Sequence, residues 1–303
     1  MNKRLDRAPE EAPTDLRRPL SGRLRAPRTI AGLAVLGLAV WWLVGVVDGA
    51  ALGEVAGAVG AAPGALAVAL VAYAAAFAVR TWAWCRLQPA LTRGQAWAAI
   101  HVSLLGNHVL PLRLGEVLRV TSVLRRTTLS ARTVIAAVLT LRLGDLLALL
   151  VVAAVAAPVA LVSIVGLAGS IGVGVLLVMA LALAWWWCAR VADGVRTPDL
   201  AIAAATVLAW ILEAAVLFAV AHTAGLQITL WQAAGVTAIT VFAQVVAVTP
   251  GGFGTYEAAG TAALVALGFP GGDAFAVVLV THGVKTAYSL VVGGVALAVP
   301  APG

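Results

Sequence analysis

The stretch TRGQAWAAIHVSLLGNHVLPLRLGEVLR, residues 92–119, decides the fold of this 303-residue chain. Its apolar part, from Gln95 to Pro111, has only about 16 residues and includes two histidines and one asparagine. A helix needs about 20 apolar residues to cross a hydrocarbon core. Basic residues flank the stretch on both sides, and basic flanks favour the cytoplasmic face of a membrane. We therefore predict a re-entrant hairpin; a short, poorly oriented crossing is the alternative.

The composition of the whole chain is that of a membrane protein. It is 62% hydrophobic and 11% charged, with a mean hydropathy of +1.02, whereas soluble domains carry about 25% charged residues. Eight of the 20 basic residues lie in residues 3–28 and eight more in residues 80–132. Because these clusters sit beside apolar spans, where they face anionic headgroups, we expect a membrane as partner and no nucleic acid.

The apolar pattern predicts an all-α, polytopic membrane protein with about six full spans and two re-entrant broken-helix hairpins. The expected spans are 29–47, 63–79, 133–157, 161–188, 200–221 and 274–299. The loop at 48–62 contains acidic but no basic residues, so the positive-inside rule puts the N-terminus and the residues from Arg80 onward in the cytoplasm. Residues 1–28 are expected to form a disordered basic arm rather than a signal peptide. Residues 29–299 are expected to form one transmembrane domain.

Residues 92–116 and 229–257 resemble one another. Each contains Thr-x-x-Gln, an apolar run, a proline, a glycine four residues after that proline, and a glutamate close behind. Three expected spans separate them, so the two copies would be inverted across the membrane. Inverted repeats with broken helices place binding sites near the membrane midplane in many transporters. The alternative is chance similarity among abundant small apolar residues.

Four charged residues lie inside expected spans, where ionised groups are costly and are candidates for function. Arg142 and Asp145 are spaced i, i+3, so they can pair on one helical face. Either a structural ion pair or a substrate contact would explain them. Glu213 and Lys285 can neutralise each other, or Lys285 can contact an anionic headgroup. His282, one turn before Lys285, is expected to be a packed or interfacial residue.

Arg113, Glu116 and Arg119 follow the first predicted hairpin at i, i+3, i+6 spacing. This spacing makes one charged helical face. The face is either solvated at the interface or binds headgroups, and its position directly after a membrane re-entry favours the second interpretation.

The turn Pro250-Gly-Gly-Phe-Gly254 is the most specific local feature. Glycines let backbone N–H groups approach a ligand, and a helix beginning near Thr255 would point its positive end at the same place. This pattern predicts a phosphate site. The alternative is a tight turn whose glycines serve helix packing alone.

Taken in order and spacing, three motifs resemble those of the lysylphosphatidylglycerol synthase transmembrane-region family. The motifs are Asn107-x3-Pro111-x-Arg113-x-Gly115-Glu116-x2-Arg119, Arg142-x2-Asp145 and Pro250-Gly-Gly-Phe-Gly-x2-Glu257. These flippase-like domains are similar to the membrane half of the multiple peptide resistance factor, and the resemblance covers residues 30–298. It implies movement of aminoacylated phospholipid between leaflets of a bacterial plasma membrane. It makes the following residues substrate-binding candidates, with Lys285 added on its own position: Asn107, Arg113, Glu116, Arg119, Arg142, Asp145, Gly251, Gly252, Gly254 and Glu257.

Two departures from the family pattern limit what the resemblance implies. Leu141 stands where relatives often have an acidic residue, so a charge relay through that position is not expected. Within residues 1–303 nothing resembles the soluble aminoacyl-transferase half, so we expect no synthase activity. We also expect no catalytic residue, no metal and no cofactor.

The first functional hypothesis is therefore a translocase for aminoacyl, glycosyl or polyprenyl-linked lipids. Its partner would be a phospholipid or another lipid with an anionic headgroup. The chain has no nucleotide-binding motif, which favours passive or ion-coupled movement. The alternatives are a membrane-embedded enzyme of lipid or cell-wall glycan assembly, because paired carboxylates can act as acid and base, and a small-solute secondary transporter.

Overall fold

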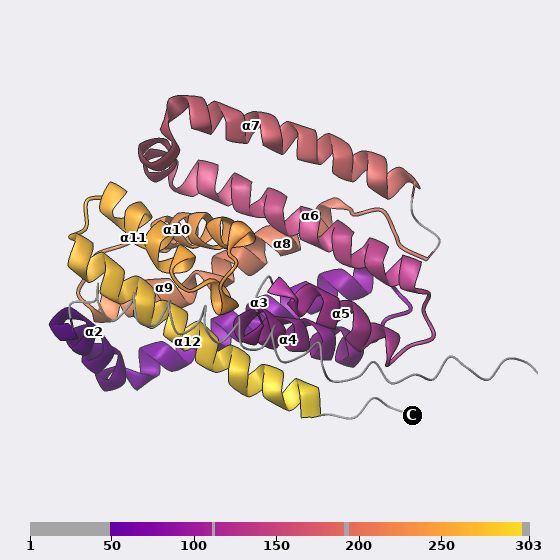
Figure 1. Ribbon diagram of the computed structural model, residues 1–303, viewed down its shortest axis with the longest axis horizontal. Helices are drawn as coiled ribbons and strands as arrows, with labels where there is room; N and C mark the ends of the chain where they lie inside the picture. Colours follow the sequence, from indigo (N-terminus) through magenta and orange to yellow (C-terminus); the bar gives the residue numbers. More distant parts are fainter. Residues whose placement is uncertain (1–48, 111–112, 191–193, 299–303) are drawn as a thin grey trace, which may run out of the picture.

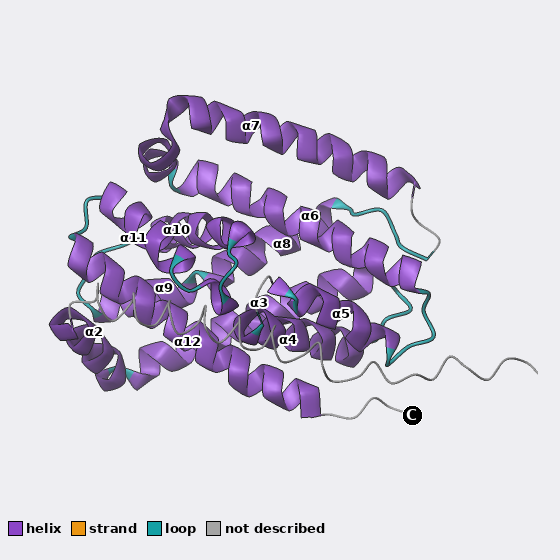
Figure 2. Ribbon diagram, in the orientation of Figure 1, coloured by secondary structure: helices purple, strands orange, loops and turns teal. Residues whose placement is uncertain are grey.

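The computed structural model describes residues 49–110, 113–190 and 194–298 (Figure 1). Every regular element in these ranges is a helix, as Figure 2 shows, so the predicted all-α fold is confirmed. The predicted first span at 29–47 and the basic arm at 1–28 lie outside the described residues.

The helices follow one another along the chain with short connections. They are α2 (Gly49–Ala61), α3 (Pro63–Leu87), α4 (Arg93–Val109), α5 (Gly115–Leu124), α6 (Ala131–Ala156), α7 (Pro158–Arg190), α8 (Leu200–Glu213), α9 (Ala215–Thr223), α10 (Leu230–Ala243), the 3₁₀ turns η3 (Gln244–Val246) and η4 (Pro250–Gly252), α11 (Thr255–Ala266) and α12 (Gly271–Ala298). Five segments in the described part are long and apolar enough to cross a membrane: α3, α6, α7 as far as Ala184, α8 with α9, and α12. They correspond to the predicted spans after the first.

Two local predictions differ from the structure. The segment predicted as a loop at 48–62 contains the 13-residue helix α2. The second span does not end before Arg80 but continues to Leu87, and this places Arg80 inside the protein. An apolar run can end while its helix continues, because a charged residue facing a polar interior interrupts the hydropathy pattern without breaking the helix.

Helices α4 and α5 form the first hairpin. The prediction confined this hairpin to Gln95–Pro111, but α4 alone fills residues 95–109, and Glu116 and Arg119, expected to follow the hairpin, lie on its second arm, α5. Thr92 and Gln95 make a capping box, in which each side chain accepts a hydrogen bond from the other residue's backbone N–H. The Gln95 amide also donates to the carbonyl oxygen of Arg126 at 2.8 Å, which ties the start of α4 to the end of α5. At the tip, a Cβ on Gly115 would lie 2.1 Å from the Ser103 carbonyl oxygen, so only glycine allows this approach.

Helices α10 and α11 form the second hairpin. Thr229 and Gln232 repeat the capping box of the first hairpin. A Cβ on Gly260 of α11 would lie 3.1 Å from the hydroxyl oxygen of Thr240 on α10, so the two helices pack closely. The similarity of residues 92–116 and 229–257 therefore corresponds to a similarity in structure.

The two hairpins approach each other from opposite ends of the molecule. In Figure 1, α10 and α11 lie toward one end of the long helices, and α4 and α5 lie toward the other. Their tips meet in the interior, where a Cβ on Gly251 would lie 3.6 Å from the carbonyl oxygen of His108. Three apolar segments, α6, α7 and α8 with α9, separate the hairpins in sequence, as an inverted repeat requires.

The outer surface is apolar where the long helices run. Helix α7 lies outermost in Figure 1, and none of its most apolar 18-residue window is buried within the protein. Leu167 is 69% exposed and Val178 is 66% exposed. An apolar surface of this extent is compatible with lipid and not with water. The fold is therefore that of a multi-pass membrane protein.

Candidate functional site

A polar cavity of about 110 Å³ lies where the two hairpin tips meet the long helices. This volume is enough for several water molecules or a small polar group. Its lining contains five basic side chains and three acidic ones, a formal excess of two positive charges. The basic residues are Arg80, Arg113, Arg119, Arg142 and Lys285, and the acidic residues are Glu116, Asp145 and Glu213. We call this space the central cavity.

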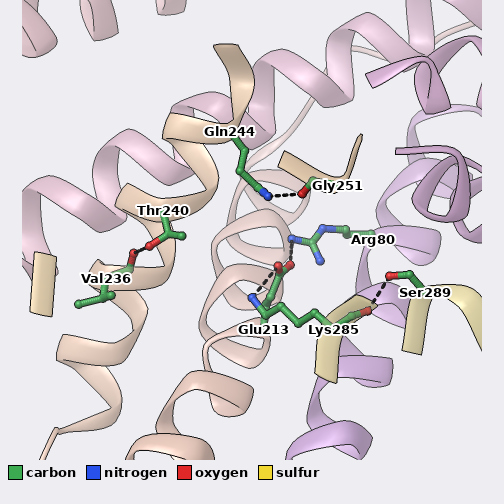
Figure 3. A network of polar contacts seen from close by, with 8 residues as sticks. All are labelled: Arg80, Glu213, Val236, Thr240, Gln244, Gly251, Lys285 and Ser289. Carbon is green, nitrogen blue, oxygen red and sulfur yellow. Dashed lines mark hydrogen bonds and ion pairs between the residues drawn. The ribbon is translucent and has the colours of Figure 1, made fainter. Parts of the chain in front are cut away.

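Glu213 of α8 holds two cations in the central cavity, as Figure 3 shows. Its Oε2 lies 3.0 Å from a guanidinium nitrogen of Arg80, and its Oε1 lies 3.2 Å from Nζ of Lys285. All three side chains are at most 12% exposed. Of the two roles considered for Lys285, the ion pair with Glu213 is the one that the structure contains.

Asp145 pairs with Arg80, 3.9 Å away on α3, and not with Arg142 as the i, i+3 spacing suggested. Arg80 also lies over the ring of Trp210, 4.3 Å from its centroid. Arg142 lines the central cavity and has no ion-pair partner among the described residues. Its charge is therefore free to meet an anion that enters.

The first hairpin contributes three charged residues and one amide. Glu116 and Arg119 pair at 3.5 Å. Asn107 accepts a hydrogen bond from the backbone N–H of Gly115 at 3.0 Å, which fixes the hairpin tip. Arg113 has a positive φ of 52°, uncommon for a residue with a side chain. Its guanidinium has one buried nitrogen without a hydrogen-bond partner, and it forms no ion pair within the described ranges.

The glycine-rich turn contributes Gly251 and Gly252 to the lining, at φ angles of 66° and 74°. Two backbone N–H groups of this turn form hydrogen bonds within the protein: that of Gly252 donates to the carbonyl oxygen of Thr249, and that of Gly254 donates to the Glu257 carboxylate at 2.6 Å. The positive end of α11 is thus met by the protein's own Glu257. These contacts favour the packing alternative for the turn over a phosphate cradle. Direct ligand binding by its glycines remains a prediction.

Nine of the eleven predicted site residues line the central cavity, and two do not. Gly254 and Glu257 lie outside the lining. Glu257 is fully buried and hydrogen-bonds Nδ1 of His282 at 2.6 Å, and His282 does line the cavity. Glu257 is therefore connected to the cavity lining through its hydrogen bond with His282.

Sequence reasoning did not assign Arg80 or His282 to the site, although both line the central cavity. Arg80 was placed at a cytoplasmic exit because it follows an apolar run. His282 was expected to be a packed or interfacial residue because a lone histidine in a span usually is, and its partner Glu257 lies 25 residues away in the sequence. The sequence did contain a signal for Glu257: a glutamate three residues after a helix-starting position is typical of a capping box.

The site is suited to binding a polar, anionic group. Within the described ranges, no group of three or more His, Cys, Asp or Glu side chains could hold a metal ion. Unpaired guanidinium groups in a site away from water bind oxyanions strongly and with defined geometry.

Two opposed hairpins inside a bundle of apolar helices, with a charged cavity between their tips, define a multi-pass membrane protein with an internal polar cavity. The motifs and the whole-chain comparison agree on its family. The chain belongs to the lysylphosphatidylglycerol synthase TM region family, whose model matches residues 29–293. This membership places the protein in a lipid-related process. No curated protein and no solved structure matches the chain.

Proposed function

We propose that this protein binds the anionic headgroup of a lipid in the central cavity and moves the lipid between the leaflets of a bacterial plasma membrane. The N-terminus would lie in the cytoplasm, and residues 29–299 would act as one domain. The cargo would be a phospholipid or another aminoacyl, glycosyl or polyprenyl-linked lipid. The observation that carries the proposal is the presence of two guanidinium groups, Arg113 and Arg142, that form no ion pair with a described residue and line the cavity at both hairpin tips.

The charge balance of the central cavity supports an anionic ligand. A charged side chain at bilayer depth costs roughly 2.5–3.5 kcal/mol on insertion scales. Pairing offsets this cost for Arg80, Arg119 and Lys285, which face carboxylates. Arg113 and Arg142 form no direct ion pair with a described residue, although the carboxylates of Glu116 and Asp145 attract them from a greater distance. A phosphate group between them would supply the missing negative charge.

An adjoining apolar groove supports an amphiphile over a small solute. The groove has a volume of about 520 Å³ and lies between α6, α7 and α8, where Leu147, Val151 and Leu181 line it. A small cavity of about 20 Å³ shares Arg80 and Asp145 with the central cavity. It shares Leu141 and Thr206 with the groove. A headgroup in the central cavity could therefore keep an acyl chain in the groove.

The basic and acidic residues would bind different parts of the headgroup. Arg113 and Arg142 would pair with phosphate oxygens. Glu116 and Asp145, each already beside an arginine, would accept hydrogen bonds from hydroxyl or amino groups of the headgroup. Movement of the two hairpins would open the cavity first to one leaflet and then to the other. Irregular backbone at membrane depth is tolerated where it lines such a cavity.

The test is lipid exchange in liposomes that contain the purified protein and a headgroup-labelled anionic phospholipid. We expect the wild type to accelerate exchange between leaflets and Arg142→Ala to lose at least tenfold of that rate. The matched control is Arg132→Ala, which removes an exposed arginine from the same helix and should leave the rate unchanged.

Three other outcomes would decide against the proposal. Chemical conversion of the lipid, detected by mass spectrometry, would indicate a membrane-embedded enzyme. Uptake of a water-soluble anion into sealed vesicles without lipid exchange would indicate a solute transporter. An exchange rate in Arg142→Ala equal to that of the wild type would remove the role assigned to the central cavity.

A further inference from the structure

His282 of α12 has one ring nitrogen occupied and the other free. Its Nδ1 lies 2.6 Å from Oε1 of Glu257, and both side chains are at most 1% exposed. Its Nε2 is buried without a hydrogen-bond partner among the described residues. His282 lines the central cavity, so the side chain that carries this free nitrogen belongs to the same site as Arg113 and Arg142.

Glu257 fixes the proton on Nδ1 of His282. Its second oxygen, Oε2, accepts the backbone N–H of Gly254 at 2.6 Å, at the positive end of α11. Both contacts favour an ionised carboxylate, which only accepts hydrogen bonds. The Nδ1 atom must therefore donate. The Nε2 atom is then a bare acceptor in the neutral ring and an N–H donor in the imidazolium.

The ring of His282 is held between two aromatic side chains, so its free nitrogen keeps one direction. The rings of Phe253 and Tyr256 stack on it, each with its centroid 4.3 Å from the imidazole centroid. An anion in the cavity would therefore find Nε2 already oriented, without an entropic cost for ordering the ring.

The titratable groups around His282 come from every helix that packs on α12. Helix α11 contributes Glu257 and Tyr256, and α4 contributes His108, whose ring centroid lies 6.2 Å away. The other titratable groups on these helices have partners or are exposed. His101 of α4 bonds Tyr288, Lys285 of α12 pairs with Glu213, His222 of α9 bonds the Ile228 carbonyl, and Glu54 of α2 is exposed. Arg113 lines the same cavity.

This environment links protonation of His282 to anion binding. An anionic oxygen that enters the central cavity would attract a positive charge on the ring and would offer an acceptor for an Nε2 proton. Charge-assisted hydrogen bonds of this kind are roughly twice as strong as neutral ones.

We infer that His282, oriented by Glu257, is a proton-linked binding site for a phosphate oxygen. The Nε2 atom takes one proton from water as the ligand enters, donates it in a hydrogen bond to the phosphate oxygen, and releases the proton when the ligand leaves. The inference rests on the proposed function, since it names the phosphoester as the group recognised in the central cavity. It adds that each binding event moves one proton, so that a proton gradient can bias lipid movement.

The test measures proton uptake on binding by titration calorimetry in buffers of different ionisation enthalpy, between pH 5 and 8, where histidine ordinarily changes charge. The probes are dihexanoyl phosphatidylglycerol and inorganic phosphate, which distinguish a lipid headgroup from free phosphate. For the wild type we expect the uptake of nearly one proton for each lipid bound. We also expect the lipid affinity to decrease with rising pH, by up to about tenfold per pH unit at the alkaline end of the range. Tighter binding of inorganic phosphate than of the lipid would overturn the lipid assignment.

His282→Gln should bind the lipid more weakly and without proton uptake. The matched control His222→Gln removes a histidine outside the cavity and should keep the wild-type uptake. Glu257→Gln should reduce the uptake, because the neutral amide no longer stabilises the imidazolium. Unchanged proton uptake in His282→Gln would refute the inference, and lipid exchange could still proceed, so the proposed function would stand. Failure of the wild type to bind either probe would refute both.

A second measurement needs no variant and covers the case in which His282→Gln does not fold. Nitrogen-15 NMR of the wild-type imidazoles distinguishes the Nδ1–H tautomer from the imidazolium. We expect one histidine to change from the first form to the second when the lipid is added at pH 7. If all four histidines keep their form on ligand saturation, the inference is wrong.

Discussion

Replacing Glu213 by glutamine tests whether the ion pairs of the central cavity are shielded from water, as their burial in the structure indicates. The change preserves side-chain size and removes the negative charge between Arg80 and Lys285, at 3.0 and 3.2 Å. Arg80 keeps Asp145 at 3.9 Å, but Lys285 loses its ion-pair partner. Removing one member of a buried ion pair costs about 3–5 kcal/mol, because the other charge stays buried and uncompensated.

The expected result is a fall in apparent Tm of about 6–10 °C, from this cost at roughly 2 °C per kcal/mol for a large chain. Thermal unfolding in detergent, followed by the fluorescence of the ten tryptophans, measures it. Lys285→Gln should cost less than Glu213→Gln, since Glu213 then keeps Arg80. The double variant Glu213→Gln/Lys285→Gln should recover part of the loss.

The matched control is the exposed pair between Arg86 and Asp199, whose side chains are 42% and 44% exposed. Asp199→Asn removes the charge and keeps a residue that can cap α8. Solvent screens such pairs, so the change in Tm should be far smaller than for Glu213→Gln. If both variants shift Tm by the same small amount, water in the cavity already screens Glu213, and the argument from uncompensated charge is wrong.

Three further outcomes are expected. Gly115→Ala should destabilise the protein by about 1–3 kcal/mol in detergent unfolding, because its Cβ would lie 2.1 Å from a backbone oxygen and the hairpin tip must open. Cysteines at the exposed positions Thr128 and Gln227, in a background without native cysteines, should react with a membrane-impermeant thiol reagent from opposite sides, because the hairpins are inverted. Hydrogen bonds from Arg86 lower the pKa of Asp199 below its usual range, so its ionised form stabilises the fold above the unfolded-state pKa near 3.9. This contribution disappears as the pH falls through the folded-state value, and the apparent Tm should fall more between pH 5 and 2.5 in the wild type than in Asp199→Asn.

Each of these outcomes has a control or a result that would contradict it. Gly94→Ala, in the same hairpin with open space around the added Cβ, should leave the stability nearly unchanged. Labelling of positions 128 and 227 from the same side would show that the two hairpins are not inverted. A wild type and an Asp199→Asn variant with parallel pH profiles would remove the role given to the Arg86–Asp199 pair.

The sequence located both helical hairpins, but it placed the whole first hairpin within residues 95–111, most of which is the single helix α4. A short apolar stretch with basic flanks and the repeated Thr-x-x-Gln pattern are visible in the chain, and in the structure each Thr-x-x-Gln forms a capping box that the sequence analysis did not predict. Lone charges within spans led to Arg142, Asp145 and Lys285, since an ionised group at that depth requires polar surroundings.

What the sequence could not give was which side chains face each other across helices. Asp145 pairs with Arg80, 65 residues earlier, rather than with the arginine one turn away. His282 depends on Glu257, which the packing of α11 against α12 brings to it. Periodicity shows which face of a helix a residue occupies, but the partner opposite that face is set by tertiary packing.

The attachment of Arg80 to Glu213 has a consequence for how the protein is made. The two residues are 133 positions apart, and Lys285 follows Glu213 by another 72. A ribosome therefore delivers Arg80, Arg113, Arg119 and Arg142 to the insertion machinery long before the carboxylate of α8 exists. During that interval Arg80 has only Asp145, at 3.9 Å in the finished protein, and lacks the closer carboxylate of Glu213. Premature termination before α8 would leave a product that quality-control proteases can recognise by this incompletely neutralised arginine.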